Sequence, residues 1–189
     1  MAKISKEKVE KFKKGEIKFG QIFDIDAKEV ASIMLTGHTL YNEGRLEDAQ
    51  KVFEGLSVLD GRNPYVHGIL GAIYQKQGKN DVAIARYTLA LNIYPQDVNS
   101  LTNRGEIYLK LGKFKEAAAD FKKAIDLDPN RKNPSANRAR MLVMLTGNVG
   151  SRVAIFLRTQ FASAPESRSL RRIRLALRPY RNRSVPAAL

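Results

Sequence analysis

A period of 34 residues is the feature that most restricts how this chain can fold. Shifting the sequence by 34 superimposes seven small, aromatic or proline positions in the same order and without gaps. In the second unit the seven positions are Gly71, Tyr74, Gly78, Ala83, Tyr87, Ala90 and Pro95. In the third unit they are Gly105, Tyr108, Gly112, Ala117, Phe121, Ala124 and Pro129. In the first unit they are Gly37, Leu40, Gly44, Ala49, Phe53, Leu56 and Gly61. Such self-similarity is typical of stacked repeats, because no single unit can bury its own apolar face. We therefore expect three stacked units, at about residues 30–63, 64–97 and 98–131.

Each recurring position suits a pair of helices joined by a tight turn. The first glycine and the central alanine of a unit would let two helix axes approach closely, beside the aromatic residue. The later glycine, as in Gly44, Gly78 and Gly112, would end the first helix in a left-handed conformation. A proline such as Pro95 cannot continue the second helix. Strict alternation of apolar and polar residues, the signal for a strand, is not found, so the predicted fold is all-α.

This pattern resembles the tetratricopeptide repeat (TPR) family over the 102 residues of the three units. The resemblance implies a right-handed α-solenoid of three helix-turn-helix repeats. Residues 1–25 are expected to be an N-terminal helical segment, and 26–147 the TPR domain, which an Asp26–Glu29 capping box opens. Residues 132–147 are expected to form a final helix that ends at Gly147 and caps the array with a solvated face.

Charge separates a C-terminal tail, residues 148–189, from this domain. The net charge of the chain is +14. Residues 1–149 hold 24 Lys and Arg against 18 Asp and Glu, whereas residues 150–189 hold nine arginines against Glu166 alone. We predict either a helical or a disordered Arg-rich tail, and the change in composition is also compatible with a fused extension.

No arrangement of residues typical of catalysis is found in the sequence. Cysteine is absent, which excludes thiolate chemistry and cysteine-ligated metals. The two histidines, His38 and His67, stand 29 residues apart, and neither a zinc-binding nor a phosphate-binding motif occurs. We expect His67 to pack in the repeat core. The chain is predicted not to be an enzyme, and no cofactor or metal is expected.

The first helices of the units are expected to line a peptide-binding groove. Positions 2, 5, 9 and 12 of each unit should face it, and tyrosines beside small residues form pockets for apolar anchors. In the third unit these positions hold Asn99, Thr102, Glu106 and Leu109, a polar face. The candidate binding residues are Met34, His38, Tyr41, Tyr65, Gly68, Ala72, Gln75, Lys76 and Glu106.

The first unit carries a narrower resemblance. Its run Tyr-x-x-Gly-x-x-x-Asp-Ala-x-x-Val-Phe-x-x-Leu-x-x-Leu-Asp, from Tyr41 to Asp60, is similar to that of class II chaperones of bacterial type III secretion, which guard translocator proteins in the cytoplasm. The resemblance implies a cytoplasmic chaperone whose groove holds an extended partner segment with apolar anchors. It carries over Tyr41 as a groove tyrosine. The oligomeric state stays open, a homodimer included.

Two other functions remain open at this point. A bacterial TPR adaptor for the assembly of protein complexes would have the same repeats. A binder of nucleic acid or anionic membrane would act through the tail, where Leu170, Ile173 and Leu177 lie along one helix face among arginines. The tail has no base-reading motif, so we expect the groove to carry the main function.

Overall fold

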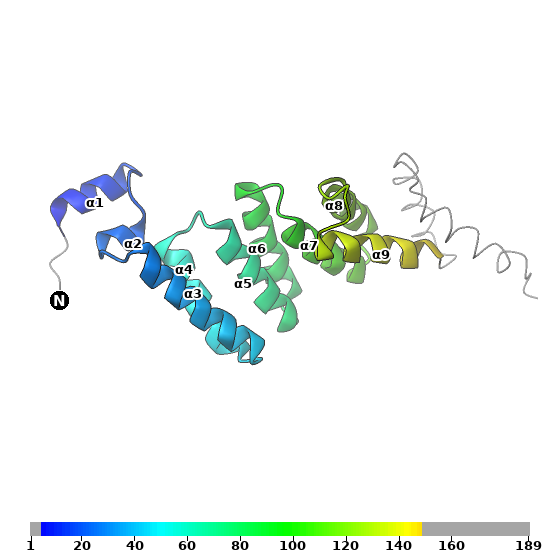
Figure 1. Ribbon diagram of the computed structural model, residues 1–189, viewed down its shortest axis with the longest axis horizontal. Helices are drawn as coiled ribbons and strands as arrows, with labels where there is room; N and C mark the ends of the chain where they lie inside the picture. The colour runs from blue at the N-terminus through cyan, green and yellow to red at the C-terminus, as the bar shows by residue number, and fades with distance from the viewer. Residues whose placement is uncertain (1–4, 149–189) are drawn as a thin grey trace, which may run out of the picture.

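The computed structural model describes residues 5–148 of the 189, and over these residues the chain is an all-α solenoid (Figure 1). Two short helices come first, α1 (Lys6–Lys13) and α2 (Phe19–Ile22). Three helix pairs follow: α3 (Ala27–Asn42) with α4 (Leu46–Leu59), α5 (Pro64–Lys76) with α6 (Asn80–Ile93), and α7 (Val98–Lys110) with α8 (Phe114–Asp126). The last helix is α9 (Pro134–Asn148), which lies against α7 and α8. Within the described residues, no helix is long and apolar enough to cross a membrane.

The two helices of each pair touch at the glycine and the aromatic residue that the repeat predicted. A Cβ atom at Gly71 would lie 2.6 Å from the Tyr87 ring, and one at Gly105 would lie 2.7 Å from the Phe121 ring. Tyr87 and Phe121 are fully buried there. Because ordinary Cβ contacts are never so short, only glycine allows the helices to approach this closely. The predicted helix crossings are confirmed.

Left-handed glycines and polar caps set the ends of the helices. Gly44, Gly78 and Gly112 follow α3, α5 and α7 with φ of 78°, 75° and 71°, as expected for glycine after a helix C-terminus. At the start of α3 the Asp26 carboxylate accepts from the backbone N–H groups of Lys28 and Glu29, each at 2.8 Å. The Glu29 carboxylate in turn accepts a hydrogen bond from the Asp26 backbone N–H at 3.0 Å, which completes the predicted capping box.

Removing this cap should weaken the first repeat. We expect Asp26→Ala to lower the free energy of unfolding by about 1 kcal/mol, since two amide N–H groups lose their acceptor. Asp26→Asn keeps an oxygen at the same place and is the matched control. Urea unfolding followed by circular dichroism measures both variants, and equal stability of the two would contradict the assigned role of the cap.

Two half-buried arginines join the third repeat to its neighbours. Arg104 on α7 binds both carboxylate oxygens of Asp120 on α8 at 2.8 Å, and its Nη1 donates to Thr88 on α6 at 2.9 Å. Arg140 on α9 binds the Asp128 carboxylate at 3.0 Å and the Ile125 carbonyl at 3.2 Å. Arg104 thus joins α7 to α6 and α8, and the charge-assisted bonds of Arg140 hold α9 on the end of the third repeat.

The predicted final helix corresponds to α9, and the structure differs from the expectation in its end and in the character of its exposed face. Helix α9 runs one residue further, to Asn148. Its outer face is apolar, with Met141, Met144 and Leu145 exposed. The repeat pattern gave no information on this face, because it covers only the three complete units.

Candidate peptide-binding groove

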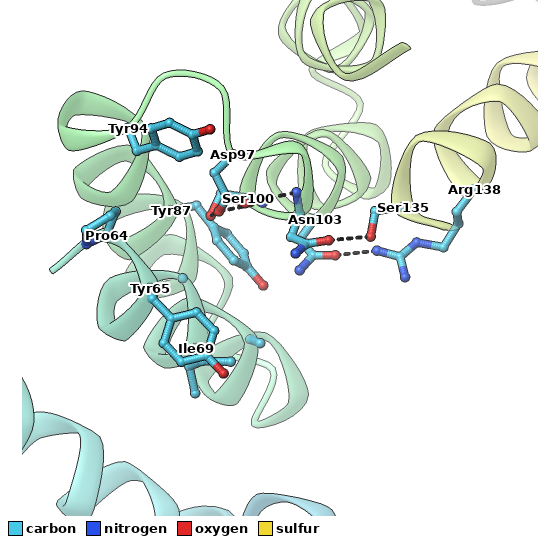
Figure 2. Close-up of a pocket in the computed structure, with 13 residues that line it drawn as sticks. Pro64, Tyr65, Ile69, Tyr87, Tyr94, Asp97, Ser100, Asn103, Ser135 and Arg138 are labelled. Atoms are coloured by element: carbon cyan, nitrogen blue, oxygen red, sulfur yellow. Dashed lines mark hydrogen bonds between the residues drawn. The ribbon is translucent and has the colours of Figure 1, made fainter. Parts of the chain in front are cut away.

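A cavity of about 420 Å³ opens between the second repeat, the third repeat and α9 (Figure 2). Helices α5, α7 and α9 supply most of its wall, because their N-terminal halves lie next to one another in the stack. The lining residues are Pro64, Tyr65, Gly68, Ile69, Ala72, Tyr87, Tyr94, Asp97, Asn99, Ser100, Asn103, Ser135 and Arg138.

The wall formed by α5 is apolar and combines large side chains with small ones. Tyr65 is 48% exposed and stands beside Ile69 at the cavity. Gly68 and Ala72 leave room next to the ring because their side chains are minimal. Gly68 also serves packing, since a Cβ there would lie 3.3 Å from Ser100 Oγ on α7. An exposed aromatic ring beside small residues can hold an apolar side chain of a bound segment.

One residue of the first repeat, His38, holds the Tyr65 side chain in place. The Tyr65 hydroxyl lies 2.5 Å from Nε2 of His38 on α3. The His38 ring in turn packs edge-on against Phe53, with ring centroids 5.3 Å apart. Partial burial raises the pKa of Tyr65, so the phenol stays protonated at neutral pH. His38 therefore positions the groove tyrosine.

Tyr87 forms a buried part of the cavity wall. Its hydroxyl donates to Oε1 of Gln75 at 2.7 Å. Burial raises the pKa of Tyr87 well above its usual range, which keeps this hydroxyl a neutral donor. Gln75 thus satisfies a buried hydroxyl.

Tyr41, Lys76 and Met34 lie outside the cavity lining. The Lys76 ammonium stands 3.8 Å from the centre of the Tyr41 ring, a cation–π contact between the first and second repeats. Tyr41 and Met34 are half-buried and pack against the core cluster of these two repeats. These three residues therefore lie on the side of the cavity toward the first repeat and do not line the cavity itself.

The opposite wall is polar, and α9 provides much of it. Arg138 Nε lies 2.5 Å from the Glu106 carboxylate, and its Nη2 donates to the Asn103 side chain. Ser135 Oγ donates to the Asn99 side chain at 2.6 Å. Figure 2 shows Asn103 facing Arg138 across the gap between α7 and α9. Amide, hydroxyl and guanidinium groups in this arrangement can bind the backbone of an extended peptide.

The structure thus brings only part of the predicted set to the cavity. Tyr65, Gly68 and Ala72 line it, while His38, Gln75 and Glu106 hydrogen-bond to lining residues. The expectation that Thr102 faces the groove is wrong: it is fully buried, and its hydroxyl donates to the Ser135 carbonyl at 3.2 Å. The docking of α9 covers this position.

Sequence reasoning missed the cavity residues Ser135 and Arg138. A signal for them exists, because Asn133-Pro134 repeats the Asn63-Pro64 pair that opens α5. Asn133 caps α9 as Asn63 caps α5: each side-chain oxygen accepts from the amides two and three residues further along the chain. The pair marks α9 as another first helix, whose opening turn should face the groove.

The expected packing role of His67 agrees with the structure, since the ring is buried and Nε2 lies 3.0 Å from the Gly61 carbonyl oxygen. In the part of the chain that the structure describes, no group of three or more His, Cys, Asp or Glu residues could hold a metal ion. The Arg-rich tail lies outside the described residues, and its predicted properties stay predictions.

Two family models, both described as tetratricopeptide repeat, match the sequence at residues 34–98 and 70–144. Together they span residues 34–144, more than half of the chain. The chain belongs to the tetratricopeptide repeat family. A comparison of this TPR protein with curated protein sequences finds no match.

Solved structures with the same fold include type III secretion chaperones. The translocator chaperone SycD of Yersinia enterocolitica shares 24% sequence identity at a TM-score of 0.64, over 68% of this TPR protein and 97% of SycD. PcrH, solved in complex with the chaperone-binding region of PopD, shares 24% at a TM-score of 0.60, over 64% and 92% of the two chains. A type III secretion complex from Aeromonas hydrophila shares 21% at a TM-score of 0.67, over 84% and 99%. At these identities the likeness shows the fold alone.

Proposed function

We propose that this TPR protein is a cytoplasmic chaperone of type III secretion translocators, which holds an extended segment of its partner in the groove. The observation that carries the proposal is the cavity beside Tyr65, with one apolar and one polar wall. Two neighbours in fold support it, since PcrH is solved with a region of PopD and SycD with a peptide of the translocator YopD.

The apolar wall binds side chains of such a segment, and the polar wall binds its backbone. An apolar side chain, proline or leucine in the first place, packs on Tyr65 beside Gly68 and Ala72. Asn99, Asn103 and Arg138 bind backbone carbonyls of the segment, because their side chains carry N–H donors at the cavity. The first repeat extends the groove at Met34, Tyr41 and Lys76, where the cation–π pair offers a flat surface for a second anchor.

A pull-down from the cytosol of the native host, followed by mass spectrometry, tests this function. We expect recovery of a translocator-like protein with long apolar segments. Ala72→Arg should abolish the recovery, because an arginine side chain would fill the cavity. Ala85→Arg, on the exposed face of α6 outside the cavity, is the matched control and should retain the partner.

Other outcomes would contradict the proposal in distinct ways. Recovery of a partner without apolar segments, lost in Ala72→Arg, would favour a TPR adaptor that uses the same groove. Equal recovery by both variants would place the binding site elsewhere. Recovery of RNA or lipid would favour the basic tail. A homodimer stays a prediction, for which light scattering during size-exclusion chromatography gives the mass directly.

A further inference from the structure

Helix α9 ends the described part of the solenoid with an uncovered apolar face. Met141, Met144 and Leu145 are 58%, 38% and 59% exposed. Residues three and four apart lie on the same side of a helix, so the three side chains form one stripe. The terminal unit of a solenoid normally presents a polar outer face to water. This stripe therefore requires an explanation.

The caps of the first helices give the register of α9 within the repeat. Asn63, Asp97 and Asn133 cap α5, α7 and α9. The first two caps are 34 residues apart and the last two are 36 apart. The two extra residues fall between Pro129 and Asn133, where Arg131 has a φ of 59°. A shift of 36, rather than 34, thus relates the third unit to α9.

In this register the stripe occupies the face of a first helix that packs on its second helix. Met141, Met144 and Leu145 correspond to Gly105, Tyr108 and Leu109 of α7. A Cβ at Gly105 would meet the ring of Phe121 on α8. Tyr108 and Leu109 pack against the cluster that contains Ala117, Phe121 and Ala124 of α8. Leu109, which was expected to face the groove, does not line the cavity. The uncovered face of α9 is therefore the place of a second helix.

The sequence after α9 continues the same register. Shifted by 36, the third unit aligns with residues 148–165. Most helix-pairing positions keep an apolar residue and a proline stands at the end, although Ala124 corresponds to the polar Gln160. Gly112, Ala118, Phe121, Ile125 and Pro129 correspond to Asn148, Ala154, Leu157, Phe161 and Pro165. A shift of 34 residues does not align this unit with the third one, because two extra residues stand between Pro129 and Asn133.

We propose that residues 149–164 of this chain cover the stripe as the second helix of a fourth, degenerate repeat. Side-chain sizes support the pairing: where Gly105 meets the large Phe121, the larger Met141 would meet the smaller Leu157. Asn148 corresponds to Gly112 of the three-residue link between α7 and α8 but still belongs to α9, so the turn into the second helix would follow Asn148. In this assignment most of the positive charge of the tail lies after Pro165, because seven of its nine arginines follow that residue.

Crosslinking of the full-length protein tests this pairing, and the natural chain has no cysteine to interfere. In Met141→Cys/Leu157→Cys a short bis-maleimide should join the two thiols within one chain. We expect the reaction to be at least about tenfold faster than in Met141→Cys/Leu170→Cys, whose second thiol lies beyond the proposed repeat. Peptide mass spectrometry identifies the crosslinked pair.

Two crosslinking results would overturn the proposal. Covalent dimers at low protein concentration would assign the stripe to a second copy of the chain. A rate equal to that of the Leu170→Cys control would mean that residues 149–164 do not cover it. Alkylation of the single variant Met141→Cys is an independent measurement. Adding Leu157→Asp should accelerate it about tenfold and adding Leu170→Asp should not; equal rates would also overturn the proposal. None of these results depends on what binds in the groove.

Discussion

Gly105→Leu is expected to lower the free energy of unfolding by about 3 kcal/mol. A Cβ at this position would stand 2.7 Å from the Phe121 ring and 3.3 Å from the Asp120 Cβ, both on α8. Neither can retreat easily, because Phe121 is fully buried and Asp120 is held by Arg104. The substitution must therefore push the two helices of the third repeat apart.

Urea unfolding monitored by circular dichroism measures this effect. The matched control is Gly55→Ala on α4, where a Cβ would meet nothing within 4 Å. That variant should be neutral or more stable by up to about 1 kcal/mol, since alanine favours a helix over glycine. If Gly105→Leu unfolded at the same urea concentration as the natural protein, the assigned crossing of α7 and α8 would be wrong.

Tyr65→Ala is expected to weaken the binding of an extended apolar peptide by about 2–4 kcal/mol. Tyr65 presents the exposed aromatic ring of the apolar wall, and His38 holds it in place. Loss of the ring removes the surface on which an anchor side chain would pack. Tyr65→Phe keeps the ring and loses only the hydroxyl, so we expect it to cost about 1 kcal/mol.

Fluorescence polarisation with a labelled peptide from the recovered partner measures these affinities. Leu89→Ala removes a comparably exposed apolar side chain from α6, outside the cavity, and should leave the affinity unchanged. Tyr41→Ala adds a test of the first repeat. An unchanged affinity in Tyr65→Ala, with the helical signal intact, would show that the anchor binds elsewhere.

Much of the fold could be predicted from the sequence because its determinants lie close together in the chain. Gly71 and Tyr87 are separated by 16 residues and belong to one helix pair, so their repetition alone indicated the crossing. Gly78 ends a helix through its own backbone conformation, and Asp26 caps α3 through amides two and three residues away. Such local signals specify helices, turns and nearest-neighbour stacking.

The composition of the groove depended on contacts between repeats that the pattern does not encode. Arg138 reaches Glu106 across 32 residues, and the Ser135 carbonyl covers Thr102 across 33. Both contacts follow from the way α9 docks, and the two-residue insertion before Asn133 displaces α9 from the 34-residue register. The hydrogen bond between His38 and Tyr65 likewise joins two repeats.

The sequence by itself determined the helices and their pairing, because each pair is stabilised by neighbouring residues. Only the tertiary structure decided which side chains line the cavity, because the packing angle and register of successive units determine which faces meet and which stay open to a ligand.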